Sequence, residues 1–115
     1  MNIQIFGVNN DFETKKAERY FKERGIKYQF INLKEKEMSY GEFSSVCNSV
    51  NINDLINKKA KDKTILSLME YLKDEDKKEK LFEEQHLLQT PIVRNGKKAV
   101  VGYKPEIYKK WSEEE

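Results

Sequence analysis

The first third of the chain switches between the two-residue period of a strand and the longer period of a helix. Residues 2–6 alternate polar and apolar side chains, which predicts a short strand that Gly7 ends. Apolar residues at helical spacing then predict a helix that stops at Gly25, and residues 26–33 alternate again. A strand, a helix and a strand in this order predict a βαβ unit, in which a right-handed crossover joins two parallel strands.

The middle of the chain, about residues 39–84, is predicted to be helical. Ser39 and Glu42 have the spacing of a capping box, which indicates the start of a second helix. The apolar side chains that follow at helical spacing are Tyr40, Phe43, Cys47 and Val50. An amphipathic helix is therefore expected directly after Ser39.

Further helical signals follow in the same region. Asn53 or Asp54 can cap a short turn, and Thr64 is placed to open a third helix. The apolar face expected for that helix consists of Ile65, Leu68, Met69 and Leu72. Residues 74–84 are almost entirely charged, so we interpret them as a solvated helix anchored by Leu81 and Phe82.

Two short β-branched runs, residues 91–93 and 99–101, flank an Asn95-Gly96 pair. Asn and Gly tolerate the positive φ angles of a type I′ turn, so this pattern predicts a β-hairpin with that turn. Proline cannot donate to a sheet ladder, which places Pro91 at the start of a strand. Pro105 is predicted to begin a last helix that turns Ile107, Tyr108 and Trp111 inward.

This order of elements predicts an α/β fold with a four-stranded mixed sheet. A βαβ unit followed by helices, a hairpin and a closing helix is the arrangement of the thioredoxin-like fold, with residues 39–84 as a helical insertion. A four-stranded mixed sheet of another topology would fit the same pattern. The length favours a single domain over residues 1–115.

Composition limits the classes of function. The 22 basic and 20 acidic residues leave a net charge of +2, which is too balanced for a general nucleic-acid binder. No apolar run approaches the roughly 18 residues of a membrane span, and the chain enters a strand pattern without a signal peptide, so we expect a cytoplasmic protein. We also expect it to be a monomer. The single cysteine and single histidine allow no internal disulfide, no cysteine-pair metal site and no multi-histidine metal site.

The expected start of the first helix is a possible reactive site. Unpaired N–H groups and the helix dipole stabilise a thiolate at such a position, but this start carries no sulfur. Either Asn10 or Asp11 can cap the helix, and Glu13 stands at capping-box spacing from Asn10. We prefer a plain cap over a catalytic carboxylate at Asp11, because the dipole would keep that carboxylate weakly basic.

The only cysteine and histidine are also candidates for chemistry. Cys47 belongs to the apolar pattern of the second helix, so we interpret it as a buried core residue rather than as a reactive thiol. His86 is interpreted as a loop or packing residue, because no activated partner is evident. The densest basic segment is residues 57–63, and it could meet an acidic partner together with Lys15, Lys16, Arg94, Lys97 and Lys98. A solvated face is the preferred interpretation.

Several short segments in a fixed order connect the chain to a known family. They are Ile3–Gly7, Lys15-Lys16-Ala17, Gly25-Ile26-Lys27-Tyr28, Asp54–Lys58, Leu87–Val93 and Val101-Gly102-Tyr103. In this order and spacing the sequence resembles the ArsC/Spx group, the arsenate-reductase-like branch of the thioredoxin fold. The resemblance implies that Pro91 is cis and faces the loop before the first helix, and that the insertion helices pack on one side of the active-site edge.

The chain departs from that group at the site itself. Active members have a cysteine at the position of Asp11, and many Spx-like members have a second one at the position of Thr14. The family's arginine before the proline is Thr90 here, and the basic residue of the insertion aligns with Asn57. The resemblance thus implies a degenerate site at Asp11, Thr14, Thr90 and Pro91, without the nucleophile and the guanidinium that arsenate needs. The residues left as candidates for binding are Asn9, Asn10, Asn57, Lys58 and Pro91.

We therefore expect a protein that acts by binding another protein rather than as an enzyme, and that uses no cofactor. By resemblance to Spx, the partner would be the C-terminal domain of the RNA polymerase α subunit, contacted by the second helix and residues 48–55. The alternative is an arsenate reductase or another thiol-dependent oxidoreductase that works through Cys47 with glutathione or thioredoxin, or a carboxylate-based activity at Asp11. A third possibility is a small-molecule pocket under Pro91.

Overall fold

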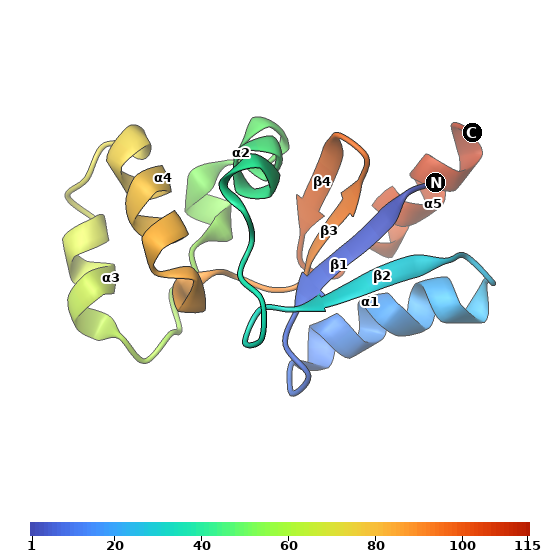
Figure 1. Ribbon diagram of the computed structural model, residues 1–115, viewed down its shortest axis with the longest axis horizontal. Coiled ribbons are helices and arrows are strands. Elements are labelled where there is room, and N and C mark those ends of the chain that lie inside the picture. The colour runs from blue at the N-terminus through green and yellow to red at the C-terminus, as the bar shows by residue number, and fades with distance from the viewer.

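Four strands form one mixed sheet at the centre of the structure, which is a computed structural model that describes residues 1–115. They are β1 (Ile3–Gly7), β2 (Tyr28–Asn32), β3 (Ile92–Asn95) and β4 (Lys98–Val101). The strands lie in the order β2-β1-β3-β4, with β1 parallel to β2 and β3 antiparallel to both of its neighbours (Figure 1). The predicted α/β class, the parallel βαβ start and the four-stranded mixed sheet are confirmed.

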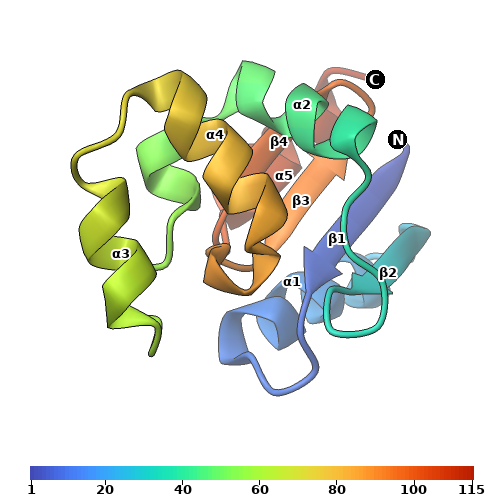
Figure 2. The same cartoon turned by 60° about the vertical axis from the view of Figure 1, so that its left-hand side comes forward.

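Five α-helices and two short 3₁₀ helices pack around this sheet. They are α1 (Phe12–Glu23), α2 (Tyr40–Ser49), η1 (Ile52–Leu55), α3 (Lys63–Met69), α4 (Asp74–Glu83), η2 (Gln85–Leu87) and α5 (Pro105–Glu113). The elements from α2 to α4 lie in the predicted helical insertion, and η2 follows it. Figures 1 and 2 show α3 and α4 side by side at the outer end of the insertion. None of the helices has the length and apolar character that crossing a lipid bilayer requires.

The alternating side chains of β1 divide the core between the two faces of the sheet. Ile3 and Ile5 point to the face covered by α1 and α5 and pack with Ala17, Tyr20, Phe21, Val93, Tyr108 and Trp111. Phe6 points to the opposite face and joins Phe43, Val46, Leu55, Met69, Leu81 and Ile92. The helical insertion is thereby anchored on one face of the sheet, while α1 and α5 cover the other.

The second strand follows the same alternation. Tyr28 and Phe30 pack against the core beside α1 and α5, whereas Ile31 and Leu33 pack against the core beside the insertion. This is the division of faces that the sequence pattern predicts. Gly25, which ends α1, has a φ of 66°, a left-handed conformation that favours glycine.

The helix starts confirm one predicted cap and correct another. Ser39 and Glu42 form the predicted capping box at α2, with Glu42 N–H donating to Ser39 and Ser39 N–H donating to Glu42. Asp11 caps α1, so the alternative cap at Asn10 and its capping box with Glu13 are wrong. The Glu13 carboxylate instead accepts a hydrogen bond of 3.2 Å from the backbone N–H of Tyr103.

Within the insertion, the structure corrects four further details. Asn51, rather than Asn53 or Asp54, caps η1, and Asp62, rather than Thr64, caps α3. Leu68 is 49% exposed, and Leu66 packs against the core in its place. On α2, Tyr40 is exposed and Val46 is buried, so the apolar face is rotated from the predicted one. In short helices the tertiary contacts, which the sequence pattern does not contain, decide which side is buried.

The hairpin turn also differs from the expectation. Asn95 pairs with Lys98, so the two turn residues are Gly96 and Lys97. Gly96 has a φ of 61°, and no residue other than glycine has a positive φ. The predicted type I′ turn is therefore wrong, because it needs positive φ at both central positions, whereas positive φ at the first alone is the type II′ pattern.

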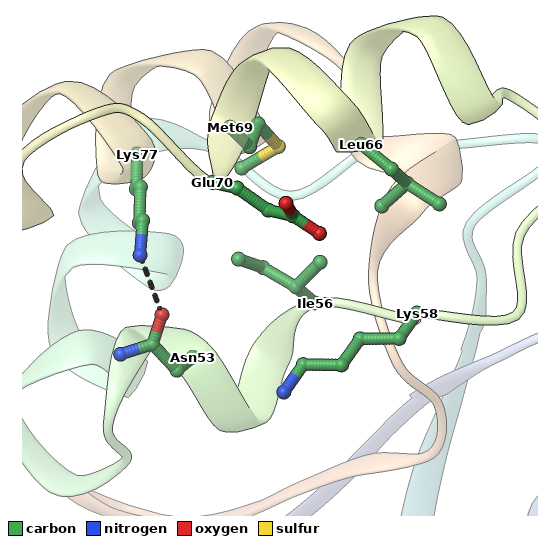
Figure 3. Close-up of a pocket in the computed structure, with 7 residues that line it drawn as sticks. All are labelled: Asn53, Ile56, Lys58, Leu66, Met69, Glu70 and Lys77. Atoms are coloured by element: carbon green, nitrogen blue, oxygen red, sulfur yellow. Dashed lines mark hydrogen bonds between the residues drawn. The ribbon is translucent and has the colours of Figure 1, made fainter.

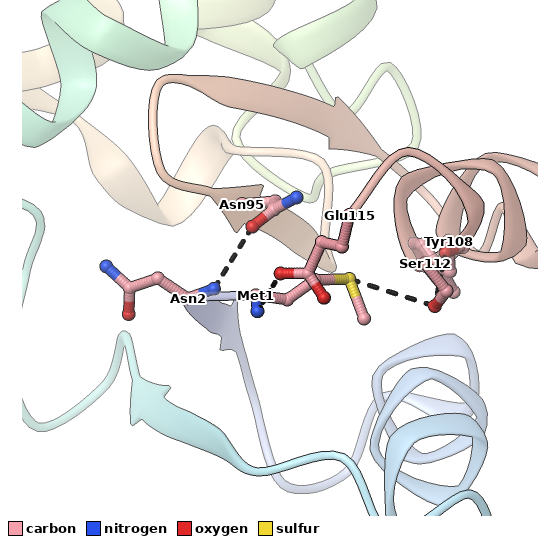
Figure 4. A network of polar contacts seen from close by, with 6 residues as sticks. All are labelled: Met1, Asn2, Asn95, Tyr108, Ser112 and Glu115. Atoms are coloured by element: carbon pink, nitrogen blue, oxygen red, sulfur yellow. Dashed lines mark hydrogen bonds and ion pairs between the residues drawn. The ribbon is translucent and has the colours of Figure 1, made fainter.

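The two ends of the chain lie next to each other beside the sheet. The amino group of Met1 pairs with the Glu115 carboxylate, and the Met1 sulfur accepts a hydrogen bond of 3.8 Å from Ser112 (Figure 4). The backbone N–H of Asn2 donates to Asn95 Oδ1 at 3.1 Å. These contacts fasten the end of α5 to the start of β1 and to the hairpin.

Candidate functional site

The candidate site is centred on the carboxylate of Asp11, the residue that caps α1. Its Oδ1 accepts a hydrogen bond of 3.3 Å from the backbone N–H of Glu13. Its Oδ2 accepts one of 2.7 Å from the hydroxyl of Thr14 and one of 2.6 Å from the hydroxyl of Thr90. Both carboxylate oxygens of this half-buried side chain are thus occupied by donors within the chain.

Thr14 is fully buried, and it fixes how closely α1 can approach the end of β1. A Cβ atom on Gly7 would lie 2.5 Å from both Cγ2 and Oγ1 of Thr14. Real Cβ atoms essentially never make contacts this short, so the backbone of β1 passes the Thr14 side chain only because residue 7 is glycine. Gly7 and Thr14 together place the start of α1, and with it Asp11, at this edge of the sheet.

Thr90 and Pro91 bring the beginning of β3 to the same place. The Thr90–Pro91 peptide bond is cis, the isomer that the family resemblance implies, and Pro91 is buried. The Pro91 carbonyl accepts a hydrogen bond of 2.7 Å from Gly102 N–H, which extends the β3–β4 pairing up to the proline. The structure therefore brings together Asp11, Thr14, Thr90 and Pro91.

The other four predicted binding residues lie in two different places. Asn9 and Asn10 are exposed at the tip of the turn before Asp11, where Asp11 N–H donates to the carbonyl of Val8. They are next to the site, and neither side chain makes a hydrogen bond within the protein. These two amides are accessible to a ligand bound near Asp11.

Asn57 and Lys58 make contacts away from Asp11. The backbone N–H of Asn57 donates to the carbonyl of Leu87 at 2.8 Å, and its side-chain oxygen accepts from Lys59 N–H at 3.0 Å. The Lys58 side chain lines a separate cavity, together with Lys77 (Figure 3). Neither side chain is hydrogen-bonded to the residues around Asp11.

Sequence reasoning did not identify the aromatic rim of the site. Phe12, directly after Asp11, is 70% exposed, and the Lys16 ammonium lies 4.8 Å from the centre of its ring. The same ammonium lies 5.8 Å from the centre of the Tyr103 ring. The sequence did contain a signal for this rim: Phe12 is an aromatic residue at the first position of a helix whose first turn is otherwise polar. Such a residue is expected to be exposed, but its exposure does not indicate a specific ligand.

Cys47 lies on α2, which packs on the opposite face of the sheet from α1. It is half-buried, so the expectation of a fully buried core cysteine is corrected: the residue packs at the edge of the core. It also lines a surface depression with Asp74 and Lys78. Burial raises the pKa of its thiol, and the nearby Lys78 ammonium lowers that pKa to a smaller extent.

His86 is exposed on η2, and its imidazole contacts two carboxylates, which the sequence pattern did not predict. Its Nε2 lies 3.2 Å from Asp62 Oδ2, and its Nδ1 lies 3.5 Å from Glu84 Oε2. Asp62 also caps α3. The imidazole therefore joins the start of α3 to the end of α4, and no nucleophile is bonded to it.

The basic residues named from the sequence do not form one patch. Lys15 and Lys16 are on α1, whereas Arg94 is half-buried on β3, where it donates to Gln4 Oε1 at 2.8 Å and to Ser45 Oγ at 3.4 Å. Arg94 Nε is buried without a hydrogen-bond partner, and no carboxylate pairs with the guanidinium. Residues 57–63 lie in the insertion. The fold therefore does not gather these cations into one surface for a single acidic partner.

Comparisons with known proteins agree with this architecture. A sequence model of the ArsC family matches residues 7–111, and no curated protein sequence matches the chain. A protein of Staphylococcus aureus COL, SACOL0876, is 27% identical with a TM-score of 0.77, covering 94% of this chain and 96% of its own. An arsenate reductase from Vibrio cholerae is 20% identical with a TM-score of 0.80, covering 96% of this chain and 97% of its own.

The wider fold class is also confirmed. The glutaredoxin-like NrdH-redoxin of Escherichia coli is 14% identical with a TM-score of 0.50, covering 96% of this chain and 93% of its own. At that identity the likeness concerns the fold alone. With the strand order β2-β1-β3-β4, it identifies the fold as thioredoxin-like.

Proposed function

The chain belongs to the ArsC family, and we propose that it acts by binding another protein and that its site at Asp11 does not reduce arsenate. The observation that carries the proposal is the occupation of the Asp11 carboxylate by the hydroxyls of Thr14 and Thr90. A carboxylate that accepts three hydrogen bonds from fixed internal donors has a structural role at the helix start. This position therefore holds no thiol, although the family resemblance places one there.

Arsenate reduction needs a thiolate, and the only thiol of this chain is that of Cys47. Reduction of arsenate by thiols begins when a thiolate attacks the arsenic atom, and a carboxylate cannot pass through the disulfide that closes such a cycle. The one thiol, on Cys47, has a raised pKa, so less of it is ionised at neutral pH than of an ordinary cysteine. It also lies on the other face of the sheet from α1.

The charge at the site also disfavours an oxyanion. Asp11 is the charged side chain at the centre, and a carboxylate repels arsenate. The Arg94 guanidinium donates to Gln4 and Ser45 on the face of the sheet that α2 covers. No arginine or lysine is hydrogen-bonded to Asp11, Thr14 or Thr90.

For the protein partner, the resemblance to Spx suggests the C-terminal domain of the RNA polymerase α subunit, which would bind α2 and residues 48–55. The shape of this surface supports the proposal. Val50 and Asn51 line two neighbouring depressions of about 350 Å³ each, one together with Cys47 and the other together with Ile107. Adjacent depressions of this kind are suited to receive side chains of a partner.

The first test is enzymatic. The native chain, Cys47→Ser and Asp11→Asn are assayed for arsenate-dependent oxidation of glutathione and of thioredoxin, with an active arsenate reductase run in parallel. We expect no turnover by any of the three proteins. Turnover by the native chain that Cys47→Ser abolishes would replace the proposal with a thiol-dependent oxidoreductase, and turnover that survives in Cys47→Ser but not in Asp11→Asn would favour carboxylate chemistry.

The second test measures binding to the isolated α-subunit domain by biolayer interferometry at physiological salt. We expect saturable binding that Asp54→Lys, at the exposed edge of the proposed surface, weakens at least about tenfold, because charge reversal at an interface disfavours the complex strongly. Glu37→Lys is the matched control, since it makes the same charge change at an exposed position outside this surface. Absence of binding by the native chain would remove this partner.

A further inference from the structure

A second cavity lies within the helical insertion and is lined by none of the residues around Asp11. Its volume is about 310 Å³, and its walls come from η1 and the chain just after it, from α3 and the residue that follows it, and from α4. Figure 3 shows the side chains around it. Ligand pockets in proteins begin at about this size, so the cavity suits a small molecule and not a nucleotide or a folded partner.

One side of this cavity is apolar. Ile56, Leu66 and Met69 line it, and Met69 is buried while the other two pack against the same core. The surface they offer is therefore held in place by the core and is not a set of mobile side chains. It can take up an aliphatic group of a few carbon atoms, which gains free energy when it leaves water.

The other side of the cavity is charged, with both signs present. The carboxylate of Glu70 points into the space between Ile56 and Leu66 (Figure 3). Lys58 and Lys77 line the same cavity, and Lys77 Nζ donates to Asn53 Oδ1 at 2.9 Å. None of these three charges takes part in an ion pair within the protein.

We propose that this cavity binds a free α-amino acid with a branched aliphatic side chain, such as leucine. The ligand's ammonium group would pair with Glu70, its carboxylate with Lys58 and Lys77, and its side chain would cover Ile56, Leu66 and Met69. Each of these contacts is a charge-assisted hydrogen bond or an apolar contact of the kind that small-ligand sites use.

Simpler ligands match the cavity less well. An aliphatic carboxylate would place its negative charge near Glu70, and an aliphatic amine would place its positive charge near Lys58 and Lys77. A neutral apolar molecule would cover all three charges without pairing any of them, which is costly. A zwitterion with an aliphatic side chain is the small ligand that satisfies both signs of charge and the apolar wall.

The test is a titration of the full, ¹⁵N-labelled chain with L-leucine, followed by amide chemical shifts. We expect saturable shifts confined to the residues around the cavity in η1, α3 and α4. Glycine, 4-methylpentanoate and 3-methylbutylamine, which lack the side chain, the ammonium and the carboxylate respectively, should each bind at least about tenfold more weakly. The spectrum itself reports whether each protein is folded.

Charge-removing variants make the test specific. Glu70→Gln should weaken leucine binding at least about tenfold and leave the binding of 4-methylpentanoate unchanged or stronger. The double variant Lys58→Met, Lys77→Met should weaken leucine and 4-methylpentanoate but not 3-methylbutylamine. Glu79→Gln and Lys61→Met are the matched controls, because both are exposed and neither lines the cavity. They should bind leucine as the native chain does.

Two results would overturn the proposal. One is the absence of saturable shifts with leucine in a chain whose spectrum is that of a folded protein. The other is leucine binding that Glu70→Gln and the lysine double variant leave unchanged, which would mean that the amino acid binds elsewhere. Neither result bears on the protein partner: the surface of α2 and residues 48–55 shares only Asn53 with the cavity, and none of these variants replaces Asn53.

Discussion

The hydroxyl of Thr90 donates a hydrogen bond of 2.6 Å to Asp11 Oδ2, although the two residues are 79 positions apart in the sequence. This bond joins the cap of α1 to the residue that precedes Pro91 and β3. The second hydroxyl on the same oxygen, from Thr14, comes from the first turn of α1 itself. One carboxylate oxygen therefore holds together the helix start and the strand start at this edge of the sheet.

The first prediction concerns this bond. Thr90→Val keeps the shape of the side chain and removes the donor, so it should lower the free energy of unfolding by about 1.5–3 kcal/mol, the usual contribution of a hydrogen bond to a charged group. Urea denaturation gives this value. A double-mutant cycle with Asp11→Ala should show a coupling of about 1–2 kcal/mol.

Asn10→Ala is the matched control for that cycle. Asn10 is the neighbouring candidate cap in the sequence, yet its side chain is exposed and makes no hydrogen bond. Its replacement should change stability by less than about 0.5 kcal/mol. Additive effects of Asp11→Ala and Thr90→Val would contradict a direct bond between the two residues.

The second prediction concerns Gly7. A methyl group there would lie 2.5 Å from two atoms of the Thr14 side chain, so Gly7→Ala should destabilise the chain by about 1–3 kcal/mol, the range for overpacking. In the background of Thr14→Ala, which removes both of those atoms, the same substitution should cost clearly less. Thermal or urea unfolding of the four proteins measures the difference.

Gly41 provides the comparison for Gly7. It lies in α2, and a Cβ atom added to it would have no neighbour within 4 Å, so Gly41→Ala meets no steric barrier. The substitution should be neutral or should stabilise the chain by about 0.5–1 kcal/mol through the better helix propensity of alanine. Equal effects of the two substitutions would show that crowding by Thr14 is not what requires glycine at position 7.

The third prediction distinguishes the helix caps of the insertion. Ser39→Ala removes a capping box in which both bonds are present and should cost about 1 kcal/mol. Thr64→Ala should have little effect, because Asp62 and not Thr64 caps α3. Urea denaturation measures the loss in free energy of unfolding for both variants. A larger loss for Thr64→Ala than for Ser39→Ala would indicate that Thr64 caps α3, as the sequence pattern suggested.

These cases show which features the sequence could predict. The capping box of Ser39 and Glu42, the end of α1 at Gly25 and the two faces of β2 depend on neighbours within a few residues. Local preference and hydrophobic period are enough for such features. The start of α5 at Pro105 belongs to the same group, since proline at the first helical position loses no hydrogen bond.

The remaining features depend on contacts between distant segments. The partner of Asp11 is Thr90, and the partner of His86 is Asp62, 24 residues away, so neither pair has a local signal. Leu66, rather than Leu68, packs against the core because the neighbours of this seven-residue helix decide its orientation. The prediction that the site around Asp11 does not reduce arsenate came from the family resemblance. The enzymatic assay with arsenate tests it.

The fourth prediction concerns the thiol of Cys47, whose pKa is raised by burial. The rate of alkylation by iodoacetamide follows the thiolate fraction, so its midpoint should lie at a higher pH than that of a cysteine in an unfolded peptide, about 8.5. The unfolded chain then loses the thiol proton at lower pH than the folded chain does. The contribution of Cys47 to stability should therefore be complete below the pKa of the unfolded chain and should decline as the pH rises through the pKa of the folded chain.

Two lysine variants test the cause of this pKa. Lys78→Met should move the midpoint of alkylation still higher, because the Lys78 ammonium lowers this pKa, whereas Lys80→Met on the same helix should not. A midpoint at or below that of the peptide would indicate an activated thiol and would favour the oxidoreductase alternative over protein binding.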